Sequence, residues 1–261
     1  MAKQAVVSSY SPGVFDQLNQ FHVARKLLAE RMDRMLCVGN VFVRHSVHER
    51  FGLSLLHKHF DLSDDEIILR KVNVKRRIVS MFPRKGQRNA VAYLWKVSAS
   101  KRNHWEFFPL EFLGPEADEN ASSGPTEELA PFLCEVAEAL ADLDLLDVFG
   151  IATTDIRGIP ITENELMIET TDPVKRLLTV KPYLHSDVKM EGLTETFWTF
   201  TPGENSDDLE AALACTGTHC HNHCRSHCRG HCVRHCVDHN PKPEKRTGSK
   251  NFANRNLQET S

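Results

Sequence analysis

Between Glu66 and Phe82 the chain reads E-I-I-L-R-K-V-N-V-K-R-R-I-V-S-M-F, in which apolar residues alternate with basic ones. A period of two places successive side chains on opposite faces of an extended strand. The stretch therefore predicts a pair of half-buried strands. The basic outer face is typical of a strand surface in contact with water.

More strands are predicted on the C-terminal side of this pair. Ala90 to Ser98 and His104 to Phe112 read as a hairpin or meander with aromatic residues between its strands. After a polar loop at Gly114 to Thr126, the apolar spacing predicts a helix from Glu127 to about Asp144. Three short strands are then expected at Leu166 to Thr170, Leu177 to Val180 and Thr194 to Thr201.

Helices are predicted on the N-terminal side. Apolar residues at three- and four-residue spacings indicate helices at Val14 to Leu36 and Val47 to Phe60, and a further short helix is expected at Asp207 to Ala214. The order of elements predicts an α+β fold, with a mostly antiparallel sheet, two or three packing helices and a Cys/His-rich C-terminal segment. We divide the chain into a globular domain at 1–206, a Cys/His-rich segment at 207–240 and a polar, disordered tail at 241–261.

Size and charge narrow the function classes. The chain has 261 residues, 41% of them hydrophobic, which is enough for a substantial core. The net charge of −3 is uneven, because the residues from Cys215 onward carry eight Lys/Arg against three Asp/Glu. A basic tail attracts phosphates, but metal-bound thiolates would cancel part of that charge, so we expect no nucleic-acid partner.

The N-terminus predicts the cellular setting. It has no continuous apolar run of signal-peptide length, and no stretch approaches a membrane span. We therefore expect an intracellular protein, cytoplasmic or nuclear, with no membrane partner. In a reducing compartment cysteines are thiols or metal ligands more often than disulfides.

The densest chemical signal lies between Cys215 and His239, which hold six of the eight cysteines and seven of the fourteen histidines. A His-Cys-x-x unit occurs five times in this stretch. Thiolate and imidazole are the ligands that Zn²⁺ and Cu⁺ prefer. We interpret the stretch as a zinc or copper(I) segment for buffering or regulation. The expected ligands are Cys215, His219, Cys220, His221, His223, Cys224, His227, Cys228, His231, Cys232, His235, Cys236 and His239.

The spacing limits the kind of metal site. It differs from the zinc-finger pattern of two pairs separated by about a dozen residues, and favours a multinuclear cluster or a labile store. A helix would place all its donors on one side of an ion, so four-fold coordination would need a fold-back, a donor from elsewhere or a second chain. Self-association through the segment is one such route. Repeat expansion without a bound ion, or disulfides in a secreted chain, are the other interpretations.

Two further functions stay open. An enzyme would need a cluster in the body, for which the candidates are His45, His48, Glu49 and His57, with His59 in the same block. No P-loop, Rossmann fingerprint, G-x-S-x-G or H-E-x-x-H is present. Reversible oxidation of the thiols would make the protein a redox or interaction module.

Three stretches carry a resemblance to other proteins. The run Phe51 to Phe60, the tetrapeptide Asp147 to Gly150 and the I-E-T-T-D at Ile168 to Asp172 are similar to those of a group of uncharacterised filamentous-fungal proteins. The resemblance implies a eukaryotic intracellular setting and implies no biochemical activity.

Overall fold

The computed structural model describes residues 3–86, 89–101, 104–114, 124–154, 159–162, 164–190, 192–202, 211–215 and 218–224. Strand β1 (Gln4–Val7) is followed by helices α1 (Pro12–Asp16), α2 (Phe21–Arg31), η1 (Met32–Arg34) and α3 (Met35–Arg44). Beyond these the fold is largely a sheet interrupted by η2 (Glu127–Leu129) and α4 (Ala130–Asp142). The predicted α+β class is confirmed.

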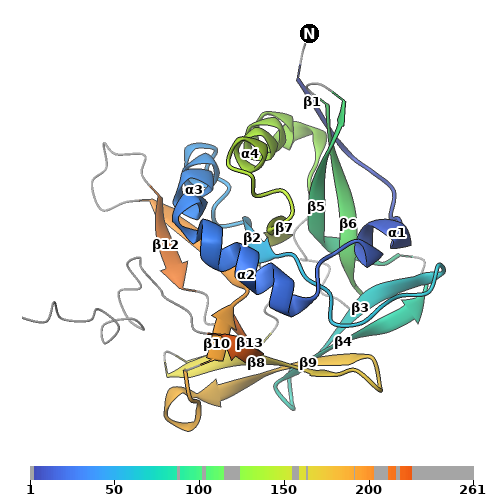
Figure 1. The fold of residues 1–261 in the computed structure, drawn as a ribbon, viewed down its shortest axis with the longest axis vertical. Coiled ribbons are helices and arrows are strands. Elements are labelled where there is room, and N and C mark those ends of the chain that lie inside the picture. Colours follow the sequence, from blue (N-terminus) through green and yellow to red (C-terminus); the bar gives the residue numbers. More distant parts are fainter. Residues whose placement is uncertain are drawn as a thin grey trace, which may run out of the picture.

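One thirteen-stranded sheet organises the molecule (Figure 1). The first group of strands is β2 (Phe51–Leu55), β3 (Glu66–Asn73), β4 (Ile78–Lys85), β5 (Val91–Lys101) and β6 (His104–Leu113). The second group is β7 (Phe149–Thr153), β8 (Glu165–Asp172), β9 (Leu177–Leu184), β10 (Gly192–Glu195), β11 (Phe197–Pro202), β12 (Ala211–Cys215) and β13 (Thr218–Cys224). Most pairings are antiparallel, as expected; β1–β6, β3–β6 and β8–β13 are parallel.

The sheet curls back on itself. Its strand order is β10-β13-β8-β9-β4-β3-β6-β5-β7-β2-β11-β12. Strands β10 and β11 stand near opposite ends of this order, yet only Thr196 separates them in the chain. The two ends of the sheet must therefore meet at Thr196, which gives the sheet an inner and an outer face.

The chain contains two copies of one structural unit. A helix, α3 or α4, ends near a residue in the left-handed region, Ser46 (φ 55°) or Asp144 (φ 57°), and a Phe-Gly strand follows. A hairpin comes next, β3–β4 in the first unit and β8–β9 in the second. The two hairpins pair through β4 and β9, and the two Phe-Gly strands pair through β2 and β7. The chain thus contains an internal repeat, and its two copies pair with each other through equivalent strands.

Reciprocal contacts support this two-fold relationship. Arg77 forms two hydrogen bonds of 2.7 Å with Glu165, and Arg176 forms hydrogen bonds of 3.2 and 2.6 Å with Glu66. Arg77 and Arg176 lie 99 residues apart, as do Glu66 and Glu165. Both arginines have positive φ, 51° and 50°, at equivalent hairpin turns. The arginine at the hairpin turn of each unit is therefore bound to a glutamate on the hairpin of the other unit.

Two glycines permit close contact between the strands at the centre. A Cβ on Gly52 would lie 2.4 Å from the carbonyl oxygen of Trp198, and one on Gly150 would lie 2.7 Å from that of Trp95. Both separations are below what carbon and oxygen tolerate. Glycine at the second position of β2 and of β7 is therefore required by the close approach of the strands.

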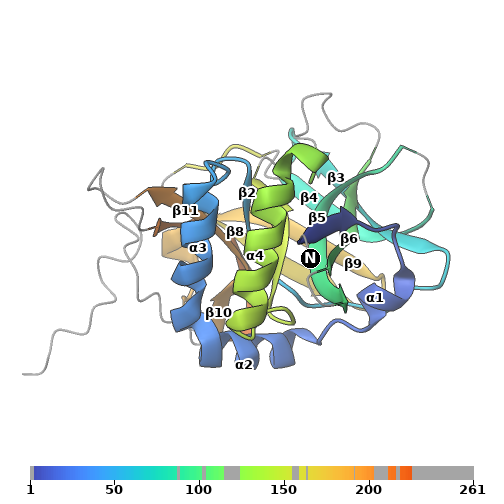
Figure 2. The same cartoon turned by 90° about the horizontal axis from the view of Figure 1, so that it is seen from above.

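Apolar side chains pack on both faces of the sheet. Helices α3 and α4 lie side by side over the outer face, where Phe42 contacts Phe132 with ring centroids 5.2 Å apart (Figure 2). A second core fills the inner face, with residues of both hairpins and β5, among them Val79, Met81, Tyr93, Leu178 and Val180. The inner core also encloses the polar cluster described below.

The predicted strands are confirmed except for the one expected at Thr194 to Thr201, which Thr196 divides between β10 and β11. Three predicted helices also need correction. Phe51–Leu55, expected within a helix at Val47 to Phe60, is strand β2, because buried residues at 51, 53 and 55 also satisfy a period of two. The helix expected at Val14 to Leu36 is divided, since the backbone of Gln20 pairs with Lys58. Residues 211–215, expected in a helix at Asp207 to Ala214, form strand β12. The predicted helix at Glu127 to Asp144 is confirmed as η2 and α4.

Candidate metal centre

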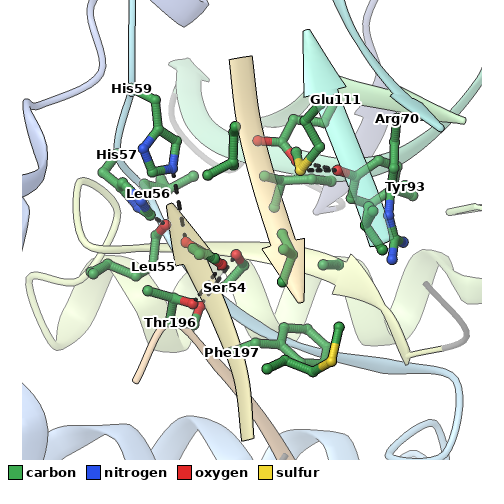
Figure 3. A pocket seen from close by; sticks show the side chains of 18 of the residues that line it. Ser54, Leu55, Leu56, His57, His59, Arg70, Tyr93, Glu111, Thr196 and Phe197 are labelled. Carbon is green, nitrogen blue, oxygen red and sulfur yellow. Dashed lines mark hydrogen bonds and ion pairs between the residues drawn. The ribbon is translucent and has the colours of Figure 1, made fainter. Parts of the chain in front are cut away.

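A short turn after β2 places two histidines on the inner side of the sheet. Strand β2 ends at Leu55, and the chain continues as Leu56-His57-Lys58-His59. Lys58 fixes the turn, because its backbone N–H donates to the Asn19 carbonyl at 2.9 Å and its Nζ donates to the Asp16 carbonyl at 2.8 Å. His57 and His59, on either side of Lys58, both line one cavity (Figure 3).

His57 presents an unprotonated nitrogen to the interior. Its Nδ1 lies 2.9 Å from the Leu55 carbonyl oxygen. A carbonyl only accepts, so Nδ1 carries the proton and Nε2 carries the lone pair. Nε2 is buried and has no hydrogen-bond partner among the described residues. The Phe21 ring packs against the imidazole with centroids 5.0 Å apart, which restricts its rotation.

His59 and Glu169 complete a three-residue cluster. His59 Nδ1 is hydrogen-bonded to Thr171 Oγ1 at 2.7 Å, and its Nε2 lies 3.8 Å from Glu169 Oε2. Glu169 Oε1 accepts a hydrogen bond of 3.0 Å from Thr196 Oγ1, whereas Oε2 is buried and accepts none from the part of the chain that is described. One donor atom from each of His57, His59 and Glu169 lies within 4.8 Å of the other two.

Burial sets the protonation of both imidazoles. It lowers the pKa of His57, against the opposing effects of Glu169 and the Leu55 carbonyl. Burial, with a smaller contribution from neighbouring His57, holds the pKa of His59 well below its ordinary value. Both rings are therefore neutral at pH 7, and their lone pairs are available without loss of a proton.

The same cavity contains a second polar group, formed by residues of β3, β5 and β6. Tyr93 donates its hydroxyl proton to Glu111 Oε2, and the Arg70 guanidinium carbon lies 5.5 Å from the Tyr93 ring centroid. Burial raises the pKa of Glu111 to about 7, although the Tyr93 hydrogen bond and the charge of Arg70 oppose this. Burial also raises the pKa of Tyr93 well above its usual range. Glu111 thus titrates near neutrality.

The cluster has the chemistry of a metal site that is open on one side. Two imidazoles and one carboxylate are ligands for Zn²⁺ in sites that keep a position for a further ligand, and for Fe²⁺ in the two-His, one-carboxylate arrangement. Each ligand has a supporting hydrogen bond from its second polar atom, to Leu55, Thr171 or Thr196. Such supporting bonds orient metal ligands.

The structure describes part of the Cys/His segment as backbone. Cys215 ends β12, and β13 contains His219, Cys220, His221, His223 and Cys224. Strand β13 pairs with β8 in parallel register, with Cys220 opposite Glu169. The first unit has β6 in the corresponding place, parallel to β3. The remaining predicted ligands, His227, Cys228, His231, Cys232, His235, Cys236 and His239, lie outside the described residues.

The histidines proposed for an enzyme do not form one cluster. Helix α3 ends at Arg44, so His45 and His48 share no helix face. His45 Nε2 lies 2.6 Å from Glu135 Oε2 on α4, and its ring packs on Phe132. Of the four candidates His45, His48, Glu49 and His57, only His57 lines the cavity.

Sequence reasoning did not identify Glu169, Glu111, Tyr93 or Arg70 as site residues. A signal was present, because Arg70 and Glu169 each follow three apolar residues at equivalent positions of two strands, in I-I-L-R and L-M-I-E. Comparison of the chain with itself at a spacing of 99 residues would have shown both.

No protein-family model, curated protein or solved structure matches the chain. Among the described helices, none is long and apolar enough to cross a membrane.

Proposed function

We propose that the protein binds a divalent first-row transition metal, Zn²⁺ being the ion to test first, through His57 Nε2, His59 Nε2 and Glu169 Oε2. The observation that carries this proposal is that one donor atom from each of the three residues lies within 4.8 Å of the other two, although Glu169 is far in sequence from the two histidines. Convergence alone is common among exposed acidic groups. Here the donors are largely buried, which makes an accidental cluster costly.

The energetic cost of burying polar atoms without partners supports the proposal. A buried polar atom without a hydrogen-bond partner destabilises a fold by roughly 1–3 kcal/mol. His57 Nε2 and Glu169 Oε2 are two such atoms within one cluster, among the residues with described placement. A bound cation would satisfy both. It would also neutralise the carboxylate, which burial otherwise disfavours.

A second metal function is favoured by the sequence. The five His-Cys-x-x units supply thiolates, which the interior cluster lacks, and thiolates suit Cu⁺ as well as Zn²⁺. We propose that this segment buffers zinc or copper(I), closing its coordination by folding back or by pairing with a second chain. The register of β13 beside β8 supports a placement of its first unit near Glu169.

The two sites can be tested separately in the full-length chain. Purified wild type is titrated with Zn²⁺, and stoichiometry is read by metal analysis and native mass measurement. Glu169→Gln and His59→Asn should each remove one bound zinc. Replacement of Cys228, Cys232 and Cys236 by serine should leave that zinc and remove the ions of the segment. Substitution is preferable to truncation at Ala214, because β13 belongs to the sheet.

A matched control is His22→Asn, which removes an exposed imidazole on α2. It should leave both stoichiometries unchanged. The interior site is tested in protein with Cys228, Cys232 and Cys236 replaced by serine. If adding Glu169→Gln to this protein left its zinc content unchanged, the interior site would be contradicted. Unchanged metal content after loss of the thiols alone would contradict the proposal for the segment.

A further inference from the structure

We propose that the cavity beside the His57–His59–Glu169 centre binds a small monoanion with an apolar body, such as a short-chain carboxylate, whose oxygen completes the coordination of the metal. The inference rests on the proposed metal site and adds the class of ligand that the site admits. Four features of the cavity lead to it: position, size, lining and charge.

The cavity lies where the two units meet. Val79 and Met81 on β4 face it from the first unit, and Leu178 and Val180 on β9 face it from the second. These four residues are register partners across the β4–β9 pairing. A ligand here would contact both halves of the molecule, as ligands do at interfaces between domains.

The size of the cavity limits the ligand. Its volume is about 100 Å³. An apolar cavity of about 150 Å³ accommodates benzene, so a body of a few carbon atoms is the appropriate scale. Leu94, Phe197 and the four β4 and β9 residues provide apolar contact for that body. Long chains and fused rings would not fit without movement of the sheet.

The arrangement of polar groups orients the ligand. The metal end is nearer to solvent, since His57, His59 and Glu169 are only partly buried. Tyr93 and Arg70 lie deeper, and are 3% and 8% exposed. A ligand entering past the histidines would place its donor atom at the metal, and its apolar part would extend between β4 and β9.

The charge of the loaded site favours an anion. A divalent cation bound by two imidazoles through their lone pairs and by one glutamate carries a net charge of +1. Glu111, hydrogen-bonded to Tyr93, is the remaining acid that lines the cavity among the described residues. In a low-dielectric cavity, uncompensated positive charge is costly, and a carboxylate from solution would neutralise it.

The test uses full-length protein with Cys228, Cys232 and Cys236 replaced by serine and the interior centre loaded with Co²⁺, because the visible spectrum of Co²⁺ reports a change of ligand. Metal loading is measured first, against Glu169→Gln. Butyrate is then added, with butyramide as its neutral isostere and 1-naphthoate as a bulky carboxylate. Butyrate should change the spectrum saturably. Butyramide should bind at least about tenfold more weakly, since it lacks the charge.

A cavity-filling variant separates the cavity from the metal. Val180→Phe occupies the space on β9 and should keep Co²⁺ while weakening butyrate by about tenfold or more. Val174→Phe, at an exposed position of the β8–β9 turn, is the matched control. Thermal unfolding of each variant checks the fold, and Leu178→Phe replaces Val180→Phe if the latter does not fold.

Each outcome decides between the two proposals. No Co²⁺ bound at this centre overturns the metal site and this inference with it. Co²⁺ that binds and depends on Glu169, with a spectrum unchanged by butyrate, overturns only the inference. Equal binding of butyrate and 1-naphthoate, or of butyrate by wild type and Val180→Phe, shows coordination from open solvent and overturns it too.

Discussion

Arg70 and Glu169 occupy equivalent positions on β3 and β8, and both side chains line the same cavity with opposite charges. Arg70 is a buried residue of β3, and Glu169 is a partly buried residue of β8. The two units therefore contribute a guanidinium and a carboxylate to one shared interior. This difference makes the interior asymmetric although the backbone around it is repeated.

The ion pair of Arg77 with Glu165 should make the free energy of unfolding decrease at acidic pH. Hydrogen bonds from Arg77, with smaller contributions from Thr162, lower the pKa of Glu165 to about 2. A depressed pKa stabilises the folded state above the unfolded value near 4.3, and that stability is lost as the pH falls toward 2. Urea unfolding should show that the free energy of unfolding falls less between pH 7 and pH 3 in Arg77→Ala than in wild type.

Arg176→Ala is the companion variant, because it breaks the symmetry-related pair with Glu66, whose pKa is also lowered mainly by hydrogen bonds from Arg176. Lys85→Ala, which removes an exposed pair with Asp65, is the control and should resemble wild type. An acid-induced loss identical in wild type and both arginine variants would contradict the predicted coupling between the units.

The glycines at the centre of the sheet should resist substitution. Gly52→Ala and Gly150→Ala each force a methyl group against a tryptophan carbonyl, so each should reduce the free energy of unfolding by about 1–3 kcal/mol. Gly13→Ala is the control, since the nearest atom to its added Cβ would be 3.9 Å away. Chemical denaturation measures all three, and equal stabilities would show that the strands can separate at little cost.

Glu111 should make the protein less stable at alkaline pH. Its folded pKa of about 7 is raised above the unfolded value, so its contribution is fully present below about pH 4 and is lost as the pH rises through 7. The surrounding charged or titratable groups are Tyr93, Arg70 and Glu169. A shift of this size corresponds to an upper limit on the order of 3 kcal/mol between pH 5 and pH 8.

Glu111→Gln retains a carbonyl for the Tyr93 hydroxyl and should remove most of that pH-dependent difference in unfolding free energy. Glu106→Gln lies on the same strand, β6, and is the control. If the glutamine at 111 left the difference between pH 5 and pH 8 intact, another group would have to be responsible.

Removal of metal should lower stability through one set of residues. A ligand that binds only the folded state stabilises it by about 2.7 kcal/mol at one hundred times its dissociation constant. With Cys228, Cys232 and Cys236 replaced by serine, chelation should therefore lower the unfolding midpoint of the zinc-loaded protein. In the same background, His57→Ala should have the same midpoint with and without zinc. His45→Ala should reduce stability, because it removes the Glu135 contact, yet should keep the response to zinc.

Local patterns in the sequence were sufficient for most strands. Alternation at Glu66 to Phe82 predicted β3 and β4, since one face of each strand is more buried than the other. The same argument failed at Phe51 to Leu55. That strand lies at the centre of the sheet with nearly all residues buried, so its apolar run also fitted a helix.

The candidate centre could be predicted only in part. His57 was among the candidates, and His59 was noted in the same block. Glu169 lies more than one hundred residues away on another unit, and it reaches the histidines because the sheet curls and joins at Thr196. No periodicity within either stretch contains that information.

The sequence by itself determined the class of the fold, the positions of most strands and the concentration of thiols and imidazoles after Cys215, because these depend on neighbouring residues along the chain. The tertiary structure alone decided that two units form one curled sheet and that His57, His59 and Glu169 share its interior. The physical reason is that such a cluster depends on strand register and sheet closure, which are set by contacts between residues distant in sequence.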